Sequence, residues 1–320
     1  MKVLVVGLGA LGNVYACMLK STGLEVYGYD KDIVVKAVEN KGVRVSGIWG
    51  EYSEKLTMVS SDLEKLRKIN FDIIIVTVKS YITEEVIKEI KCLVTENTDV
   101  FLFQNGYGNY EAAIKHLPEN KIILGRIIFG AETLGLGESK VTVIADDVII
   151  GSPKNLISLS KIQEYARIFS KALIPTQASD RVLEYIWAKI IYNSALNTMG
   201  AIFEVNYGKL AENEYSKDLM ESIIREIFAL LDKMGQHTLW PDADSYIKVF
   251  YDKLIPTTAA HHASMLQDIN NGRRTEIAAL NGAVVNLAKR YKVDAEVNKV
   301  VVNLVKTKEF FAIKYGNKAN

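Results

Sequence analysis

The chain has 320 residues, of which 49% are hydrophobic and 24% charged, as in globular proteins of two ordinary domains. Its 39 lysines and arginines nearly balance its 38 aspartates and glutamates. This balance does not indicate a protein that binds nucleic acid or an anionic membrane. Cys17 and Cys92 both fall in expected helices, which favours reduced thiols. Since we find neither a leader nor an apolar run of about 18 residues, we expect a cytoplasmic enzyme.

The first thirty residues predict a dinucleotide-binding unit. KVLVV at 2–6 is typical of a strand covered on both faces, and it leads into GLGALG, a helical pattern that stops at Gly23, and a second strand at 25–30. In this position the three glycines allow a tight turn, the approach of a pyrophosphate, and close packing of helix and strand. The alternative is an ordinary glycine-rich turn. We expect the cofactor phosphates at Gly7, Leu8, Gly9, Ala10, Leu11 and Gly12.

Asp30 and Lys31 favour different cofactors. A carboxylate at the end of the second strand normally accepts hydrogen bonds from the ribose hydroxyls of NAD and repels a 2′-phosphate. The neighbouring lysine can instead pair with that phosphate, although without the bidentate geometry of an arginine. From these two residues alone, both NADP(H) and NAD(H) remain open.

Strands and helices continue to alternate as far as residue 173. We expect strands at 71–79 and 99–106 with a helix between them, and antiparallel strands at the sheet edge within 121–132 and 140–152. A helix over 152–173 follows, with Ser152 as its N-cap and Pro153 in its first turn.

Lys79 and Asn105 end two of these strands. In open α/β sheets ligands bind outside the carboxyl ends of the strands, which makes both side chains candidates for a site. Taken singly, each is better explained without a site, Lys79 as a surface lysine and Asn105 as a turn residue before a glycine.

From residue 178 the pattern predicts helices alone, at 180–200, 208–235, 242–254, 257–271, 275–291 and 294–314. We therefore expect two domains: a Rossmann-type α/β domain at 1–177 that binds NAD(P), and an all-α domain at 178–320 for substrate and dimerisation. Substrates commonly lie in a cleft between two such domains.

The stretch WAKIIYNSALN places Lys189, Asn193 and Asn197 four residues apart. On an α-helix these side chains share one face, which drifts by only about 40° per step. When a hydride reduces a ketone, negative charge develops on the carbonyl oxygen, and a lysine ammonium can stabilise that charge and deliver the proton. Lys189 is the only cation in the column, and the two amides can bind a small keto acid. The alternative is that the amides pair with neighbouring backbone.

A second informative stretch covers residues 261–282. Ser264 falls in a helix that we expect to end near Gly272, and Thr275 is the expected cap of a new helix with Glu276 in its first turn. An acid there is favoured by the helix dipole alone, and Ser264 can bond to its own helix. The adjacent histidines at 261–262 face different directions and lack the spacing of a helical metal site, so we expect no metal.

The motifs GLGALG, VKSY, FQNG, AKIIYNSALN with GKL downstream, and SMLQDINNGRRTEI together resemble ketopantoate reductases (2-dehydropantoate 2-reductases). The resemblance runs from residue 1 to about residue 305 in the family's order and spacing. It implies NADPH-dependent reduction of ketopantoate to (R)-pantoate on the way to pantothenate and coenzyme A, and a homodimer formed by the helical domain.

The resemblance also implies roles for individual residues. The family's catalytic lysine falls on Lys189 and its acid on Glu276; its substrate-binding amides and hydroxyl fall on Asn193, Asn197 and Ser264; and its lysine and asparagine near the cofactor fall on Lys79 and Asn105, with Glu276 also reaching the cofactor. Two positions depart from the family. Asp30-Lys31 stands where an arginine is common, and Tyr207-Gly208 where Asn-Gly is common, with Asn206 one residue early.

Two other functions remain compatible with the sequence. One is an NAD-dependent D-2-hydroxyacid dehydrogenase for branched 2-keto acids, which Asp30 and Tyr207 favour. The other is a non-catalytic sensor of NAD(P)H, although a sensor has no need of a proton donor such as Lys189.

Overall fold

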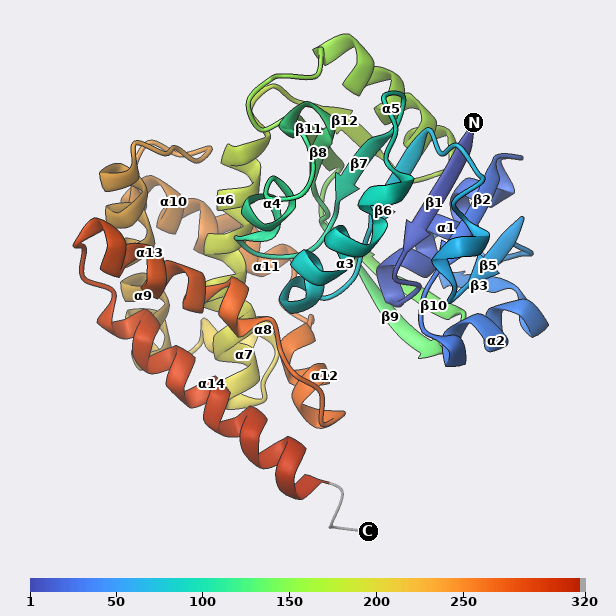
Figure 1. Ribbon diagram of the computed structural model, residues 1–320. Helices are drawn as coiled ribbons and strands as arrows, with labels where there is room; N and C mark the ends of the chain where they lie inside the picture. Colours follow the sequence, from blue (N-terminus) through green and yellow to red (C-terminus); the bar gives the residue numbers. More distant parts are fainter. Residues whose placement is uncertain (317–320) are drawn as a thin grey trace. The chain divides into compact units, whose positions relative to one another are not determined.

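The computed structural model describes residues 1–316, which fall into two units (Figure 1). The first comprises Met1–Gln104 and Asn109–Val182, and the second comprises Asn105–Gly108 and the chain from Leu183 onward. The boundary therefore falls slightly beyond the expected residue 177, and a short segment after the strand at 99–102 groups with the second unit.

An eight-stranded sheet forms the centre of the first unit, in the order β12-β11-β8-β7-β6-β1-β2-β5. Its middle strands are parallel and buried along their length, because helices cover both faces, as the apolar runs predicted. The strands are β1 (Lys2–Val6), β2 (Glu25–Tyr29), β5 (Met58–Ser60), β6 (Ile73–Val76), β7 (Asp99–Leu102), β8 (Ile122–Arg126), β11 (Val148–Gly151) and β12 (Thr176–Ala178).

A second sheet of four strands, in the order β4-β3-β10-β9, packs on α1 (Ala10–Ser21). It joins segments far apart in the sequence, coloured blue and green in Figure 1. Its strands are β3 (Val43–Gly47), β4 (Tyr52–Glu54), β9 (Phe129–Gly135) and β10 (Glu138–Ile144). Because α1 lies between two sheets, every residue from Gly12 to Leu19 is buried, and none of them is charged.

The predicted antiparallel strands at the sheet edge were only partly right. Each expected strand divides in two: 121–132 supplies β8 and β9, and 140–152 supplies β10 and β11. β11 does run antiparallel to β8, but β12 pairs parallel to β11 and closes the edge beyond it.

The remaining helices of the first unit are α2 (Asp32–Lys41), α3 (Thr83–Ile90), α4 (Asn109–Ala113) and α5 (Leu159–Lys171). The prediction that α5 begins at Ser152 was wrong. Ser158 caps the helix by accepting a hydrogen bond from the Lys161 N–H, whereas the Ser152 hydroxyl accepts from the Leu156 N–H in the preceding turn. Both serines fit the capping pattern, and only the fold decides between them.

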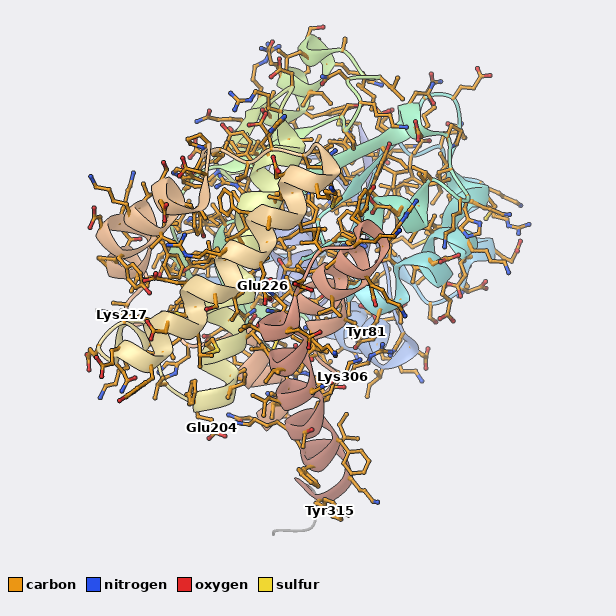
Figure 2. All side chains as sticks on the ribbon, turned by 90° about the vertical axis from the view of Figure 1, so that its left-hand side faces the viewer. Tyr81, Glu204, Lys217, Glu226, Lys306 and Tyr315 are labelled. Carbon is orange, nitrogen blue, oxygen red and sulfur yellow. The ribbon has the colours of Figure 1, made fainter. Side chains whose placement is uncertain are left out.

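Among its described residues, the second unit contains helices joined by turns and loops, and no strand. Its helices are α6 (Val182–Tyr192), α7 (Thr198–Phe203), α8 (Tyr207–Leu210), α9 (Glu214–Met234), α10 (Ala243–Val249), α11 (Ile255–Thr257), α12 (Ser264–Asn270), α13 (Asn281–Tyr291) and α14 (Glu296–Tyr315), with π-helical turns at Asn193–Asn197 and Phe250–Leu254. The apolar side of α9 lies at the centre of the core, and Figure 2 shows α9 and α14 running beside each other. None of the described helices is long and apolar enough to cross a membrane.

The two thiols differ in environment. Cys17 is buried in α1, where burial raises its pKa to about 12, whereas Cys92 is exposed. Since the thiolate is the reactive form, we expect a disulfide reagent at pH 8 to label one thiol quickly in the folded protein and the second only in denaturant. Rapid labelling of both thiols in the folded protein would contradict this burial of Cys17.

Candidate active site

The glycine-rich loop joins β1 to α1 in the predicted geometry. Gly7 has a φ of 91°, which favours glycine, and its N–H donates to the carbonyl of Tyr29 at 2.9 Å. A side chain on Gly12 would overlap the carbonyl oxygen of Gly7. The loop thus turns tightly and lets α1 approach β1 closely, as a phosphate-binding loop requires.

The N-terminus of α1 is open. Gly9 is its N-cap, is exposed, and supplies no side-chain cap; a Cβ there would have no atom within 4 Å. The N–H groups of a first helical turn have no partner within the helix, so they are available to an anion. The space beside Gly9 and these donors fit the pyrophosphate of a dinucleotide.

Asp30 connects the end of β2 to the glycine-rich loop. Its carboxylate accepts hydrogen bonds from the Leu8 N–H at 2.5 Å and from the Lys31 N–H at 2.6 Å. Each carboxylate oxygen keeps a further lone pair, so these bonds leave Asp30 able to accept from a ribose hydroxyl. The Lys31 side chain is exposed, at the N-cap of α2.

The segment after β6 packs against the same loop. The Thr77 hydroxyl donates to the carbonyl of Gly7 at 2.6 Å, and Val78 occupies the space where a Cβ on Gly7 would lie. Lys79 follows at the start of the short 3-10 turn Ser80–Ile82 and is half-buried. The first unit therefore brings Lys79 to the glycine-rich loop. Sequence reasoning missed Thr77, which looks like an ordinary strand residue.

In the second unit, Asn105 connects Lys189 to Glu276. The Lys189 Nζ donates to Asn105 Oδ1 at 2.7 Å, and Asn105 Nδ2 donates to Glu276 Oε2 at 3.3 Å. The amide therefore turns its oxygen to the cation and its nitrogen to the anion, and all three side chains are half-buried. Residues predicted separately from three distant motifs form one hydrogen-bonded group.

Close backbone contacts hold Asn105 in this position. The Tyr107 N–H donates to the carbonyl of Ala279 at 2.8 Å, and a side chain on Gly106 would overlap that same carbonyl. The segment 105–108 is thus fixed on the turn that carries Glu276. The Asn-Gly pair serves the packing of this segment as well as its bend.

Glu276 does not sit in the first turn of a helix capped by Thr275, as we expected. α13 begins only at Asn281, and Glu276 immediately precedes the 3-10 turn Ile277–Ala279. The Thr275 hydroxyl accepts from the N–H of Ile277 in this 3-10 turn at 3.4 Å, and Thr275 donates from its N–H and its hydroxyl to Glu309 Oε2, both at 2.7 Å. Glu309 on α14 thus holds the residue before Glu276, a contact that the sequence did not reveal, since nothing marks Glu309 among the other polar residues of that helix.

The column of Lys189, Asn193 and Asn197 is not one regular α-helix. α6 carries Lys189, but the residues Asn193–Asn197 form a π-helical turn. Asn193 is half-buried in that turn, whereas Asn197 is buried. Side-chain spacing of four is compatible with either helix type, which explains why the sequence predicted only the commoner one.

Asn197 connects this turn to α12. Its Oδ1 accepts from the Met265 N–H at 3.1 Å and its Nδ2 donates to the Ser264 hydroxyl at 3.2 Å. The N-cap of α12, Ala263, supplies no side chain for capping, so Asn197 satisfies a free N–H from outside the helix. The exposed Ser264 hydroxyl is thereby placed beside the Asn197 amide.

The departure at Tyr207 has a structural explanation. Asn206 is the N-cap of α8, where its Oδ1 accepts from the Lys209 N–H at 3.1 Å. Tyr207 is buried, with its ring edge-on to those of His261 and Tyr192 at centroid distances of 5.3 and 6.0 Å. The asparagine one residue early therefore starts a helix, and the tyrosine fills the core beneath it.

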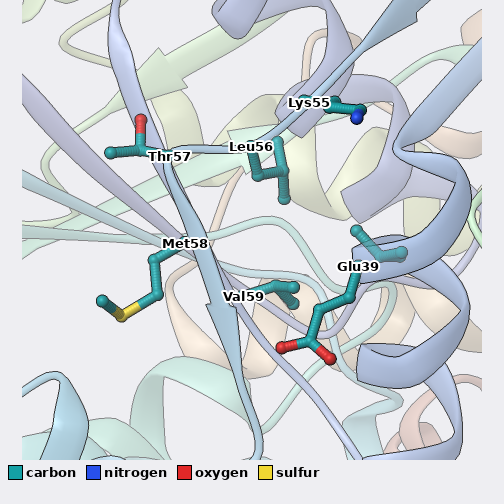
Figure 3. Close-up of a pocket in the computed structure, with 7 residues that line it drawn as sticks. Glu39, Lys55, Leu56, Thr57, Met58 and Val59 are labelled. Atoms are coloured by element: carbon teal, nitrogen blue, oxygen red, sulfur yellow. The ribbon is translucent and has the colours of Figure 1, made fainter.

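Within residues 1–316, no cluster of three histidine, cysteine, aspartate or glutamate residues could hold a metal ion. A hollow of about 230 Å³ in the first unit is lined by residues of α2 and of the segment through β5 (Figure 3). It contains none of the predicted site residues. Its lining is Val38, Glu39, Lys55, Leu56, Thr57, Met58 and Val59.

Comparison with known proteins identifies the family. The sequence model described as ketopantoate reductase PanE/ApbA matches residues 3–155, and the model of that family's C-terminal part matches residues 181–309. The chain belongs to the ketopantoate reductase family. It is therefore an NAD(P)-dependent oxidoreductase, and the predicted combination of a Rossmann-type domain with a helical domain is confirmed.

Relatives of this family match over nearly their full length. A 2-dehydropantoate 2-reductase of Aquifex aeolicus is 46% identical over 98% of this chain and 99% of its own, and one of Pyrococcus abyssi is 29% identical over 97% and 98%. Among solved structures, a ketopantoate reductase of Ralstonia eutropha has a TM-score of 0.86 at 28% identity, covering 98% of this chain and 99% of its own. D-mandelate dehydrogenase bound to NADH and anilino(oxo)acetate has a TM-score of 0.87 at 25% identity, with the same coverage.

Proposed function

We propose that this protein reduces 2-dehydropantoate to (R)-pantoate with NADPH, the reductive step in the formation of pantothenate. The observation that carries the proposal is the group of Lys189, Asn105 and Glu276, which joins a half-buried ammonium to a carboxylate through one amide. The 46% identity to a 2-dehydropantoate 2-reductase over nearly the whole chain supports the choice of substrate.

In this proposal Lys189 is the proton donor. Reduction of the keto group places negative charge on its oxygen, and an ammonium in a partly buried site stabilises that charge better than water does. Lys189 then gives a proton from Nζ to this oxygen, so that the former keto group becomes a neutral hydroxyl. General acid catalysis of this kind contributes about 10²–10⁴-fold to the rate.

Asn105 and Glu276 have two proposed tasks. The Asn105 oxygen accepts from Lys189 and so directs the ammonium, while its nitrogen is held by Glu276. An amide held at both ends cannot rotate freely, so the lysine stays oriented before substrate arrives. Glu276 can in addition accept a hydrogen bond from the substrate hydroxyl through its remaining lone pairs.

The other polar side chains are proposed to bind the two ends of the substrate. Ser264 is exposed at the start of α12, where its hydroxyl can donate to a carboxylate. The amides of Asn193 and Asn197 suit the substrate hydroxyl. Since Asn197 already bonds Met265 and Ser264, it can offer only its second N–H and second lone pair.

The proposed cofactor supplies the hydride when bound. The glycine-rich loop, with its open helix N-terminus at Gly9, is proposed to hold the pyrophosphate. Asp30 and Lys31 are proposed to contact the adenosine ribose, and Lys79, Asn105 and Glu276 to complete the cofactor contacts.

Cofactor preference can be predicted from the contacts of Asp30 and Lys31. The exposed Lys31 can pair with a 2′-phosphate, but only as a solvent-screened ion pair, so we expect NADPH to be preferred by less than about a hundredfold in kcat/KM, and less at high salt. The contributions of the two residues can be separated by substitution. Lys31→Ala should shift the preference towards NADH, and Asp30→Asn should shift it towards NADPH. Asp30→Asn keeps an acceptor for the Leu8 N–H. Initial rates with both cofactors at two salt concentrations provide the test, and an unchanged preference in both variants would remove these residues from cofactor selection.

The function itself is tested by product analysis. The protein, NADPH and ketopantoate are incubated, and loss of absorbance at the nicotinamide band is compared with chromatographic yield of pantoate. We expect one pantoate for each NADPH oxidised, in the R form. NADPH that is oxidised without pantoate, or not oxidised at all, would refute the proposal.

One alternative substrate class has an observation in its favour. Asp30 at the end of β2 suits NADH, and D-mandelate dehydrogenase, which shares the fold at 25% identity, was solved with NADH. The alternative is therefore an NAD-dependent dehydrogenase for branched 2-keto acids. Faster reduction of 2-ketoisovalerate by NADH than of ketopantoate by NADPH would favour it.

A homodimer is the proposed assembly. The helix α14 exposes several apolar side chains, and its last turns, ending near Tyr315, project beyond the other helices of the second unit in Figure 2. These side chains are Val300, Leu304, Phe310, Phe311, Ile313 and Tyr315. Light scattering at micromolar concentration tests the assembly, and a monomeric mass would exclude it.

A further inference from the structure

The π-helical turn Asn193–Asn197 needs hydrogen-bond partners from outside its own helix. The Thr198 N–H donates to the carbonyl of Asn193, five residues back instead of four. A turn of this kind widens the helix and leaves carbonyl groups without their usual donor, and π turns are accordingly rare and frequent at functional sites. The π turn is therefore stable only if another group donates a hydrogen bond to such a carbonyl.

Asn281, the first residue of α13, supplies it. Its Nδ2 donates to the carbonyl of Ser194 inside the turn at 3.1 Å, and its Oδ1 accepts from the Thr198 hydroxyl just after the turn at 2.8 Å. All three residues are fully buried. One amide thus holds both ends of the turn where water does not reach.

The orientation of that amide is fixed by a chain of two further side chains. The Glu226 carboxylate on α9 accepts from Asn298 Nδ2 at 2.7 Å, and from the N–H groups of Val297 and Asn298. Asn298 must then turn its Oδ1 to Asn281, whose Nδ2 donates to it at 3.0 Å. Because a carboxylate only accepts, it sets the direction of every bond as far as Ser194. Figure 2 shows Glu226 on α9 where that helix lies beside α14.

We propose that Asn281 is a positioning residue for the substrate: it holds the π turn open and so sets the directions in which Asn193 and Asn197 leave the helix relative to Lys189. Without it, the turn can close to regular α-helix. Closing the turn would shift the helix before it by one residue relative to the helix after it. Such a shift rotates the side chains of the two parts by about 100° relative to each other. Because Met265 holds Asn197 in place, Lys189 and Asn193 would then lose their register with it.

The inference rests on the proposed function only in its kinetic readout. In Asn281→Leu we expect the KM for ketopantoate to rise at least about tenfold, with a smaller fall in kcat, since a displaced binding group can cost up to about a hundredfold. The Kd for NADPH, whose proposed contacts do not include Asn193 or Asn197, should stay within about twofold. An unchanged KM in the folded variant would overturn the inference.

A milder pair of variants keeps the test decisive if Asn281→Leu fails to fold. Thr198→Val has nearly the same shape but cannot donate to Asn281, and we expect it to raise the KM, whereas Thr198→Ser retains the hydroxyl and should restore it. Ser216→Ala is the matched control, because it removes a buried hydroxyl that donates to the carbonyls of Leu210 and Asn213 and has no hydrogen bond to the turn or to Asn281. Ser216→Ala should lower the melting temperature without changing the KM. Equal KM effects in Ser216→Ala and Thr198→Val would reduce the role of Asn281 to general stability.

Amide hydrogen exchange separates this inference from the proposed function. Exchange at residues 193–198 should accelerate in Thr198→Val and Asn281→Leu but not in Ser216→Ala, whatever substrate the enzyme uses. If the wild-type protein does not reduce ketopantoate and exchange still accelerates in this way, the function is wrong and the positioning role stands. Unchanged exchange at these residues would refute the positioning role even in an active ketopantoate reductase.

Discussion

Lys189→Ala is expected to lower kcat by at least about a hundredfold while the protein still binds NADPH. The reason is that the ammonium, directed by Asn105, is the group proposed to stabilise the developing alkoxide and to protonate it. Removing it leaves the negative charge to amides and water. Stopped-flow or steady-state rates with ketopantoate measure the loss, and fluorescence titration of NADPH shows whether the first unit is intact.

The control for Lys189 is another lysine of the second unit. Lys306, labelled on α14 in Figure 2, is exposed, and Lys306→Ala changes the net charge by the same amount. We expect its kcat to stay within about twofold of wild type, because surface substitutions away from a site have small effects. Turnover near wild type in Lys189→Ala would remove this lysine from the mechanism.

Gly9→Val is expected to weaken NADPH binding by at least about a hundredfold without unfolding the chain. No atom of the protein lies within 4 Å of a Cβ at this position, so the folded state accommodates the side chain. The branched side chain would instead occupy the space in front of the first turn of α1, where the pyrophosphate is proposed to bind. Calorimetric titration measures the affinity and thermal unfolding measures the stability.

Gly12 gives the complementary result for the same loop. A Cβ there overlaps the carbonyl of Gly7, so Gly12→Ala should lower the melting temperature as well as the affinity. The two variants therefore distinguish a position that contacts the cofactor, where only the affinity falls, from a position that also packs within the protein, where the melting temperature falls as well. Unchanged NADPH affinity in Gly9→Val would mean that GLGALG is not the phosphate-binding loop.

Much of the candidate site could be predicted because its parts are local patterns. A glycine-rich turn between an apolar strand and a helix has few structural solutions, and polar residues at the ends of parallel strands gather at one edge. Lys189, Asn105 and Glu276 come from three separate motifs, and the structure joins them by hydrogen bonds. Their chemistry could be inferred before their distances were known.

The features that were missed depend on tertiary partners. Four-residue spacing predicts an α-helix at 189–197, and only the amide of Asn281, far along the chain, accounts for the π turn found there. Thr275 fits the pattern of an N-cap, but its hydroxyl accepts from the N–H of a 3-10 turn rather than of an α-helix, and its N–H and hydroxyl donate to the distant Glu309. The strands β4 and β5 have only three residues each, which is too few for a period to show.

The ratio of kcat/KM for ketopantoate to that for 2-ketoisovalerate, with NADPH in both assays, tests the central claim most directly. The second acid carries the same keto and carboxylate groups but lacks the hydroxyl that Asn193, Asn197 and Glu276 are proposed to bind. A site built to bond a hydroxyl rejects an analogue without it, because its buried polar groups are left unpaired. We predict a ratio of at least about a hundred in favour of ketopantoate; a ratio near one, or a preference for 2-ketoisovalerate, would contradict the account.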